Sequence, residues 1–94
     1  MVGKKLYISG KVQGVSFRFY AHEQASSLGI SGWVRNLTDG RVEMILAGDP
    51  LAVETMIKWA HKGPPTAEVV SVEVVDFKEP LPLEPFFIKR DGGK

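Results

Sequence analysis

Residues 13–18 hold the side chains and backbone best suited to binding an oxyanion: Gln13, Gly14, Val15, Ser16, Phe17 and Arg18. Gly14 accepts backbone conformations that other residues resist, so the chain can turn sharply and direct several amides at one point. Arg18 adds a permanent planar cation that can bind two phosphate oxygens. A cation in a first helical turn is unfavourable beside the positive end of the helix dipole, which indicates an anion that offsets the repulsion. We interpret the segment as a phosphoryl-binding loop; the alternative is a structural turn followed by a surface arginine.

Asn36 is the second residue with a chemical use. It lies near the end of a strand-like segment, on the same face as Val34, because side chains alternate along a strand. If Val34 faces the helices, Asn36 lies in the same layer as the 13–18 loop, and its amide can donate to or accept from a water there. The alternative is an asparagine that caps a turn.

Other candidate groups give weaker predictions. His22 and His61 lack a carboxylate at metal-ligand spacing, and the chain has no cysteine, so we assign no metal and no cofactor. Glu23 follows His22, but adjacent helical residues point about 100° apart, which favours a solvated pair over an acid–base pair. Trp33 and Trp59 are expected to cover apolar surface rather than stack on a ligand.

Alternation and helical spacing predict the elements that must position these residues. The order is strand, helix, strand, strand, helix, strand and a short final edge strand, at 4–12, 17–28, 30–37, 41–48, 50–62, 67–77 and 86–90. Asp39 and Gly40 suit a tight hairpin turn between the second and third strands. This order predicts an α+β fold, a two-layer sandwich with two helices on one face of a mostly antiparallel sheet.

Each predicted helix carries an apolar stripe that should face the sheet. The first helix is expected to bury Phe17, Tyr20, Ala21, Gln24, Ala25 and Leu28, and the second Val53, Met56, Ile57 and Ala60. The chain of 94 residues is long enough for one domain, residues 1–94, in which 91–94 would form a flexible tail.

Composition limits the classes of function. The net charge of +1 gives no field that would attract nucleic acid or an anionic membrane over distance. No apolar stretch is long enough for a signal peptide or a membrane span, and the lack of cysteine makes the reducing cytosol the simplest compartment. We therefore expect a cytoplasmic protein, and a monomer because no long apolar stripe is left over.

Two segments together resemble the acylphosphatase family. Residues 8–18 (ISGKVQGVSFR) resemble its first signature and residues 32–48 (GWVRNLTDGRVEMILAG) its second. The similarity continues through Gly63-Pro64-Pro65 to the final strand, so it covers essentially the whole chain. Departures are slight: Ser16 fills an open position, Leu37 stands where many relatives carry Thr, and residues 91–94 extend past the final strand.

This resemblance implies a ferredoxin-like βαββαβ sandwich that hydrolyses acyl phosphates to carboxylate and inorganic phosphate without a metal. It implies that Arg18 and the amides of the 13–18 loop bind the phosphoryl group, that Asn36 positions the attacking water, and that a substrate oxygen accepts the proton. The departing carboxylate has a parent acid with a pKa of about 4, so it needs no general acid. Inorganic phosphate is expected as product and competitive ligand, and the acyl group is left unspecified.

Two other interpretations of the sequence are disfavoured. The RNA-recognition fold shares the element order, and LYISG resembles its first-strand signature, but RVEMILAG carries no aromatic residue where such a sheet needs stacking rings. Within the family, the chain could be the acylphosphatase-like domain of a larger enzyme that uses carbamoyl phosphate. The end of the chain at Lys94 favours the free enzyme as an expectation.

Overall fold

The computed structural model describes residues 1–82 and 84–92. Its elements are β1 (Val2–Lys11), α1 (Phe17–Ser27), β2 (Ser31–Asn36), β3 (Val42–Gly48), α2 (Pro50–Lys62), β4 (Glu68–Asp76) and β5 (Phe87–Ile88). The predicted order is confirmed, and each boundary lies within two residues of the expected one. Within residues 1–82 and 84–92, no helix has the length and apolar character needed to cross a membrane.

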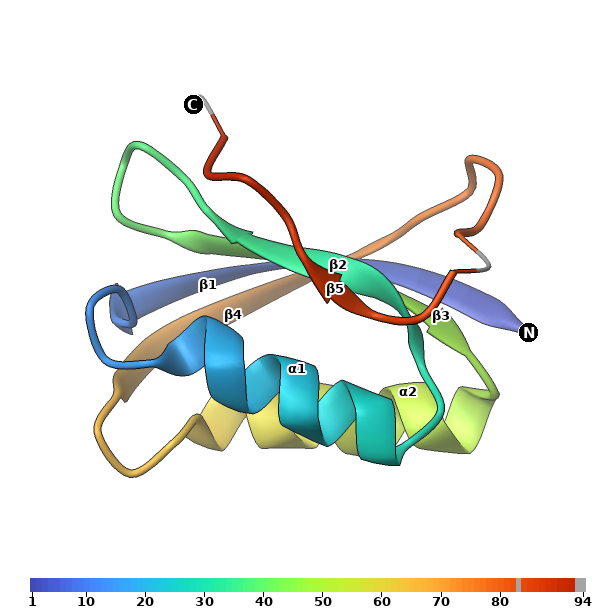
Figure 1. The fold of residues 1–94 in the computed structure, drawn as a ribbon, viewed down its shortest axis with the longest axis horizontal. Helices are drawn as coiled ribbons and strands as arrows, with labels where there is room; N and C mark the ends of the chain where they lie inside the picture. Colours follow the sequence, from blue (N-terminus) through green and yellow to red (C-terminus); the bar gives the residue numbers. More distant parts are fainter. Residues whose placement is uncertain (83, 93–94) are drawn as a thin grey trace.

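The strands form one sheet in the order β4-β1-β3-β2-β5. Neighbouring strands are antiparallel except β2 and β5, which run parallel. Both helices cover the same face of the sheet (Figure 1). This is the predicted two-layer α+β sandwich of the ferredoxin-like type, with the final strand confirmed as a short edge strand.

The core lies between the helices and the sheet. Ala21 and Ala25 of α1 and Met56 of α2 are fully buried against β1, β2 and β3. The prediction that Tyr20 joins this stripe is wrong, because Tyr20 is exposed. The buried residues of α1 are Phe17, Ala21 and Ala25, a single row at four-residue spacing, so the core-facing strip is narrow. The ring of Tyr20 instead lies edge-on to that of Phe19 at the margin of the helix, with ring centroids 5.3 Å apart.

Gly32 allows the backbone of β2 to pack closely against that of β3. Gly32 has a φ of 131°, and a Cβ there would collide with the carbonyl oxygen of Ile45 on β3. Only glycine combines this backbone angle with so close an approach. The register that follows pairs Asn36 with Val42, which fixes the position of Asn36 at the end of β2.

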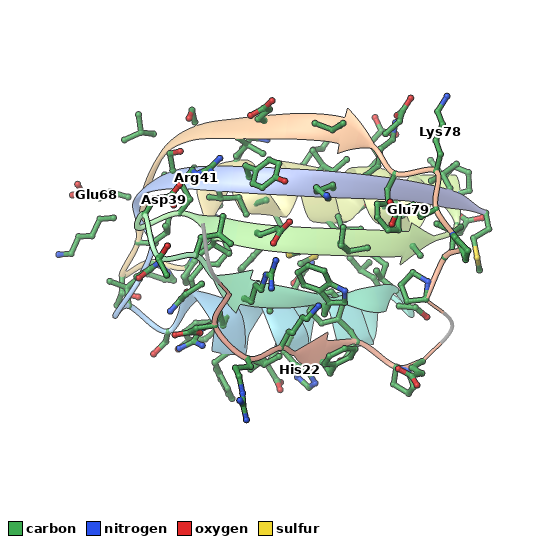
Figure 2. The ribbon with its side chains drawn as sticks, turned by 90° about the horizontal axis from the view of Figure 1, so that it is seen from above. His22, Asp39, Arg41, Glu68, Lys78 and Glu79 are labelled. Atoms are coloured by element: carbon green, nitrogen blue, oxygen red, sulfur yellow. The ribbon has the colours of Figure 1, made fainter. Side chains whose placement is uncertain are left out.

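The β2–β3 hairpin turns at the end of the sheet that carries the β1–α1 loop. Its backbone amide at Leu37 donates to the carbonyl of Arg41 at 2.8 Å. The Asp39 carboxylate accepts hydrogen bonds from the backbone amide of Arg41 at 3.0 Å and from its Nε at 2.8 Å (Figure 2). The backbone bond first, then the guanidinium, lowers the pKa of Asp39 below its usual 3.8.

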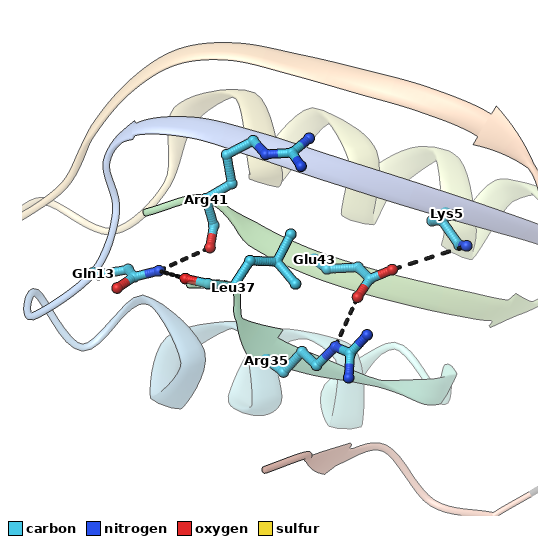
Figure 3. A network of polar contacts seen from close by, with 6 residues as sticks. All are labelled: Lys5, Gln13, Arg35, Leu37, Arg41 and Glu43. Atoms are coloured by element: carbon cyan, nitrogen blue, oxygen red, sulfur yellow. Dashed lines mark hydrogen bonds and ion pairs between the residues drawn. The ribbon is translucent and has the colours of Figure 1, made fainter. Parts of the chain in front are cut away.

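The buried carboxylate of Glu43 pairs with two cations on the sheet face opposite the helices. Glu43 of β3 lies between Arg35, whose Nε donates to Oε1 at 2.7 Å, and Lys5, whose Nζ is 3.9 Å from Oε2 (Figure 3). The Arg35 guanidinium also stacks over the ring of Trp33, 5.1 Å from its centroid. Paired cations therefore compensate the charge of Glu43 where it is removed from water.

Candidate active site

A cavity of about 390 Å³ opens where the β1–α1 loop meets the end of β2. It is lined by Val12, Gly14, Ser16, Phe17, Arg18, Phe19, Asn36 and Ile88. The loop and the asparagine that the sequence singled out separately therefore lie in one pocket. The inference from strand alternation is confirmed in its geometry, because Val34 is fully buried under the helices and Asn36 follows on the same face.

The backbone of the loop leaves the start of α1 open to an anion. Gly14 has a φ of 74° and Ser16 a φ of 62° with ψ 24°, both in the left-handed region. Ser16 is the residue that precedes α1, yet its side chain makes no capping hydrogen bond, and the first turn contains no acidic residue. Helix N-termini present backbone N–H groups without intrahelical partners and a positive dipole end, so this one is suited to a phosphoryl group.

Two of the predicted loop residues make contacts that hold the loop in place, Gln13 through its side chain and Val15 through its carbonyl. The Gln13 Nε2 donates to the carbonyl oxygens of Leu37 at 2.8 Å and Arg41 at 2.9 Å, which connects the loop to the β2–β3 hairpin (Figure 3). On the other side of the loop, the Thr66 hydroxyl donates to the carbonyl of Val15 at 2.7 Å. The loop is therefore fixed between the hairpin and the segment after α2, a support that the sequence pattern did not predict.

Asn36 is buried, with 9% of its surface exposed, and its Oδ1 has no hydrogen-bond partner among residues 1–82 and 84–92. Buried amide oxygens nearly always have a partner, and one without costs free energy. The next residue, Leu37, has no polar side-chain atom to offer. An acceptor left open in a pocket beside Arg18 is the arrangement expected of a group that binds a water or a ligand.

Arg18 lies in the pocket lining and also contacts the end of the chain. Its Nη1 donates to Asp91 Oδ1 at 2.8 Å. The guanidinium carries further N–H groups, so this contact does not exhaust its donors. The sequence did not point to Asp91.

The segment after β5 continues alongside β2 (Figure 1). The amide of Lys89 donates to the carbonyl of Val34 at 2.8 Å, and the amide of Gly92 donates to that of Asn36 at 2.9 Å. This brings Ile88 into the lining of the pocket and Asp91 to the guanidinium of Arg18. Residues 93–94 lie outside the described residues, so the flexibility predicted for residues 91–94 stays a prediction.

The competing candidates lie elsewhere. His22 Nδ1 is 3.9 Å from Glu23 Oε2, both side chains are well exposed, and neither lines the pocket; Figure 2 shows His22 beside β5. Within the part of the chain that the structure describes, no three His, Cys, Asp or Glu residues are grouped to hold a metal ion. Trp59 packs against Phe17 with ring centroids 5.3 Å apart, which supports the loop from the core side.

Comparison with known proteins assigns the family. The sequence model of the acylphosphatase family matches residues 4–88. An acylphosphatase from Thermococcus kodakarensis is 54% identical over 81 residues, 86% of this chain and 88% of that protein. One from Acidiphilium cryptum is 46% identical over 93 residues, 99% of this chain and 100% of its own. The crystal structure of acylphosphatase from Bacillus subtilis, 29% identical, superposes with a TM-score of 0.90 over 95% of this chain and 99% of that one. The chain belongs to the acylphosphatase family, hydrolases that cleave the anhydride bond of acyl phosphates.

Proposed function

We propose that this chain hydrolyses acyl phosphates in the pocket between the β1–α1 loop and the end of β2, without a metal. The observation that carries the proposal is the buried Oδ1 of Asn36, which has no hydrogen-bond partner within residues 1–82 and 84–92 and lies in the same pocket as Arg18 and the open N-terminus of α1. Phosphoryl transfer needs neutralised charge on the phosphoryl oxygens and a nucleophile held in line with the leaving group. These residues meet both needs.

In this mechanism Arg18 and the backbone amides from Gln13 to Phe17 hold the phosphoryl oxygens. Asn36 accepts a hydrogen bond from the attacking water through Oδ1 and orients it toward phosphorus. An amide is too weak a base to take the proton, so a phosphoryl oxygen accepts it as the oxygen–phosphorus bond forms. The bond between phosphorus and the acyl oxygen breaks, and the carboxylate leaves as the anion, which needs no general acid because its parent acid has a pKa of about 4.

Asp91 sets a condition on this binding. Its carboxylate holds Nη1 of Arg18, so the phosphoryl group must either share the guanidinium or displace Asp91 from it. Both side chains are substantially exposed, and an exposed ion pair is weak, about 0–1 kcal/mol. A dianionic phosphoryl group that also accepts backbone N–H bonds competes successfully with such a contact.

The test compares Arg18→Ala and Asn36→Gln in hydrolysis of benzoyl phosphate, with inorganic phosphate as inhibitor and with added chelator. Arg18→Ala should raise KM and lower kcat together, and it should weaken inhibition by phosphate. Asn36→Gln should lower kcat while phosphate still competes with unchanged affinity. Arg41→Ala removes an arginine outside the pocket and serves as the matched control. Unchanged hydrolysis in either pocket variant, or loss of activity with chelator, would contradict the mechanism.

Three further properties belong to the proposal: a monomeric state, a cytoplasmic location and no binding of nucleic acid. The absence of aromatic residues from β3 (VEMILAG) and the net charge of +1 argue against an RNA-binding sheet. The lack of cysteine suits the reducing cytosol. Sedimentation tests the monomer, titration with RNA at low salt tests nucleic-acid binding, and cell fractionation tests the location.

A further inference from the structure

The pocket has two chemically different parts. Gly14, Ser16, Arg18 and Asn36 form the polar part, and Val12, Phe17, Phe19 and Ile88 form the apolar part. Val12 and Phe17 are buried in the core, but Phe19 is 54% and Ile88 44% exposed. At about 390 Å³ the cavity lies in the size range of small-molecule sites, about 300–1,000 Å³. Two large apolar side chains therefore present free surface at the mouth of a site whose inner part is polar.

The helix and the sheet edge dictate these exposed positions. Phe17 and Ala21 face the core from α1, so Phe19, which lies between them in sequence, faces away from it. Ile88 lies on β5, paired with Val34 at the edge of the sheet. A lone exposed apolar residue is ordinary, but here two converge on one pocket from elements at opposite ends of the sequence.

We propose that Phe19 and Ile88 form the acyl subsite and that they select acyl phosphates with an apolar, above all aromatic, acyl group. This inference rests on the proposed function, which places the phosphoryl group at Arg18 and the water at Asn36. Because water and leaving group lie on opposite sides of phosphorus in an in-line displacement, a water at the buried Asn36 directs the acyl group toward the exposed mouth. There it contacts Phe19 and Ile88.

Charge at the mouth adds a second criterion. Arg18 is the one cationic residue in the pocket lining among residues 1–82 and 84–92, and Asp91 is bound to it. An acyl group with a second carboxylate would meet the carboxylate of Asp91 and find no free cation in that lining. The subsite therefore favours neutral acyl groups over anionic ones.

The test measures kcat/KM for benzoyl, acetyl and succinyl phosphate, which carry an aromatic, a minimal and an anionic acyl group. In Phe19→Ala and in Ile88→Ala, the ratio of benzoyl to acetyl phosphate should fall about three- to ten-fold, the size of one aromatic contact. Phe19→Leu keeps apolar bulk and should lose less. Leu51→Ala on α2 removes an apolar side chain that is even more exposed, at 72%, and lies outside the pocket, so it should leave the ratio unchanged.

In Asp91→Asn the ratio of succinyl to acetyl phosphate should rise about two- to five-fold. A ratio cancels any common effect of Asp91 on phosphoryl binding. Benzoyl-to-acetyl ratios that stay unchanged in both alanine variants would overturn the acyl subsite, while continued hydrolysis of acetyl phosphate would leave the proposed function standing. A wild-type protein that hydrolyses none of the three substrates would overturn the proposed function itself.

Discussion

Replacing Asn36 with leucine should make the protein more stable and inactive. Leucine has nearly the shape of asparagine but no polar atom. In the folded protein the Oδ1 of Asn36 is buried and has no hydrogen-bond partner among residues 1–82 and 84–92, so it is left for the water of the proposed mechanism. A buried acceptor that the protein itself does not satisfy costs about 1–3 kcal/mol. Asn36→Leu removes that cost, so we expect the free energy of unfolding to rise by at least about 1 kcal/mol. For a domain of this size, 1 kcal/mol corresponds to a Tm increase of about 4–8 °C.

The loss of activity should be large because the water is no longer oriented. Removal of one preorganised hydrogen-bonding group from an active site typically lowers kcat about 10²–10³-fold. Arg18 and the amides of the β1–α1 loop remain, so binding of inorganic phosphate should persist. A substitution that raises stability and lowers turnover identifies a residue that is retained for function although it destabilises the folded protein.

The assay is thermal and urea unfolding in buffer without phosphate, because a ligand that binds the folded state would itself raise Tm. Asn36→Ala is the control: it removes the same oxygen but leaves a void, which offsets the gain. If Asn36→Leu is less stable than wild type, Oδ1 is satisfied in the folded protein and the premise is wrong. If Asn36→Leu hydrolyses benzoyl phosphate within ten-fold of wild type, Asn36 does not position the water.

Three further perturbations give separate tests. Gln13→Leu removes the hydrogen bonds from its side chain to the carbonyls of Leu37 and Arg41, which keep only their backbone partners within the hairpin. Loss of these two bonds should cost about 1–2 kcal/mol in urea unfolding, and phosphate inhibition should weaken; unchanged inhibition would mean that this anchor does not shape the loop. Glu43→Ala leaves Arg35 without its buried partner and should lower the free energy of unfolding in urea by about 2–4 kcal/mol. Glu43→Gln should have an intermediate stability. Equal stability of the wild type and both variants would contradict the role of the ion pair. The hydrogen bond from Lys4 lowers the pKa of the Asp76 carboxyl, so the folded state binds the proton of this group less tightly than the unfolded chain does. The resulting stability is present above pH 3.8, the ordinary pKa of an aspartate, and is lost as the pH falls through the lowered pKa. In Asp76→Asn, Tm should fall less steeply with decreasing pH than it does in the wild type. An identical pH dependence of Tm in the two proteins would show that Asp76 does not contribute to acid unfolding.

Patterns within short stretches of sequence predicted those features of the fold that depend only on neighbouring residues, such as side-chain alternation in a strand and the position of a turn. Alternation placed Val34 and Asn36 on the helix-facing side, because a strand inverts its side chains at each residue. Asp39-Gly40 marked the hairpin because few residues accept its backbone angles. Tyr20 was misplaced because helical spacing gives the direction of a side chain but not the width of the buried strip, which in α1 is the single row Phe17, Ala21 and Ala25.

The unpredicted part of the site depends on contacts between distant segments. Ile88 and Asp91 reach the pocket only because residues 87–92 run parallel to β2, and no local signal in either segment specifies that pairing. Phe19 is an ordinary exposed helical residue in the sequence, and its interest comes from lining the same pocket as Ile88. Gln13 is a similar case, since its partners are the carbonyls of Leu37 and Arg41, 24 and 28 residues later in the chain.

The pairing of residues 87–92 with β2 also bears on aggregation. Without it, β2 would be the edge of the sheet, and its free amides and carbonyls would offer a template for strands of other molecules. The covering strand β5 is short, and the chain beyond it carries Lys89, Arg90 and Asp91, charges that oppose growth of the sheet by further strands. Residues 87–92 thus protect this edge of the sheet from intermolecular pairing while they contribute to the pocket. Selection for a stable, unaggregated sheet and selection for the active site act on the same few residues.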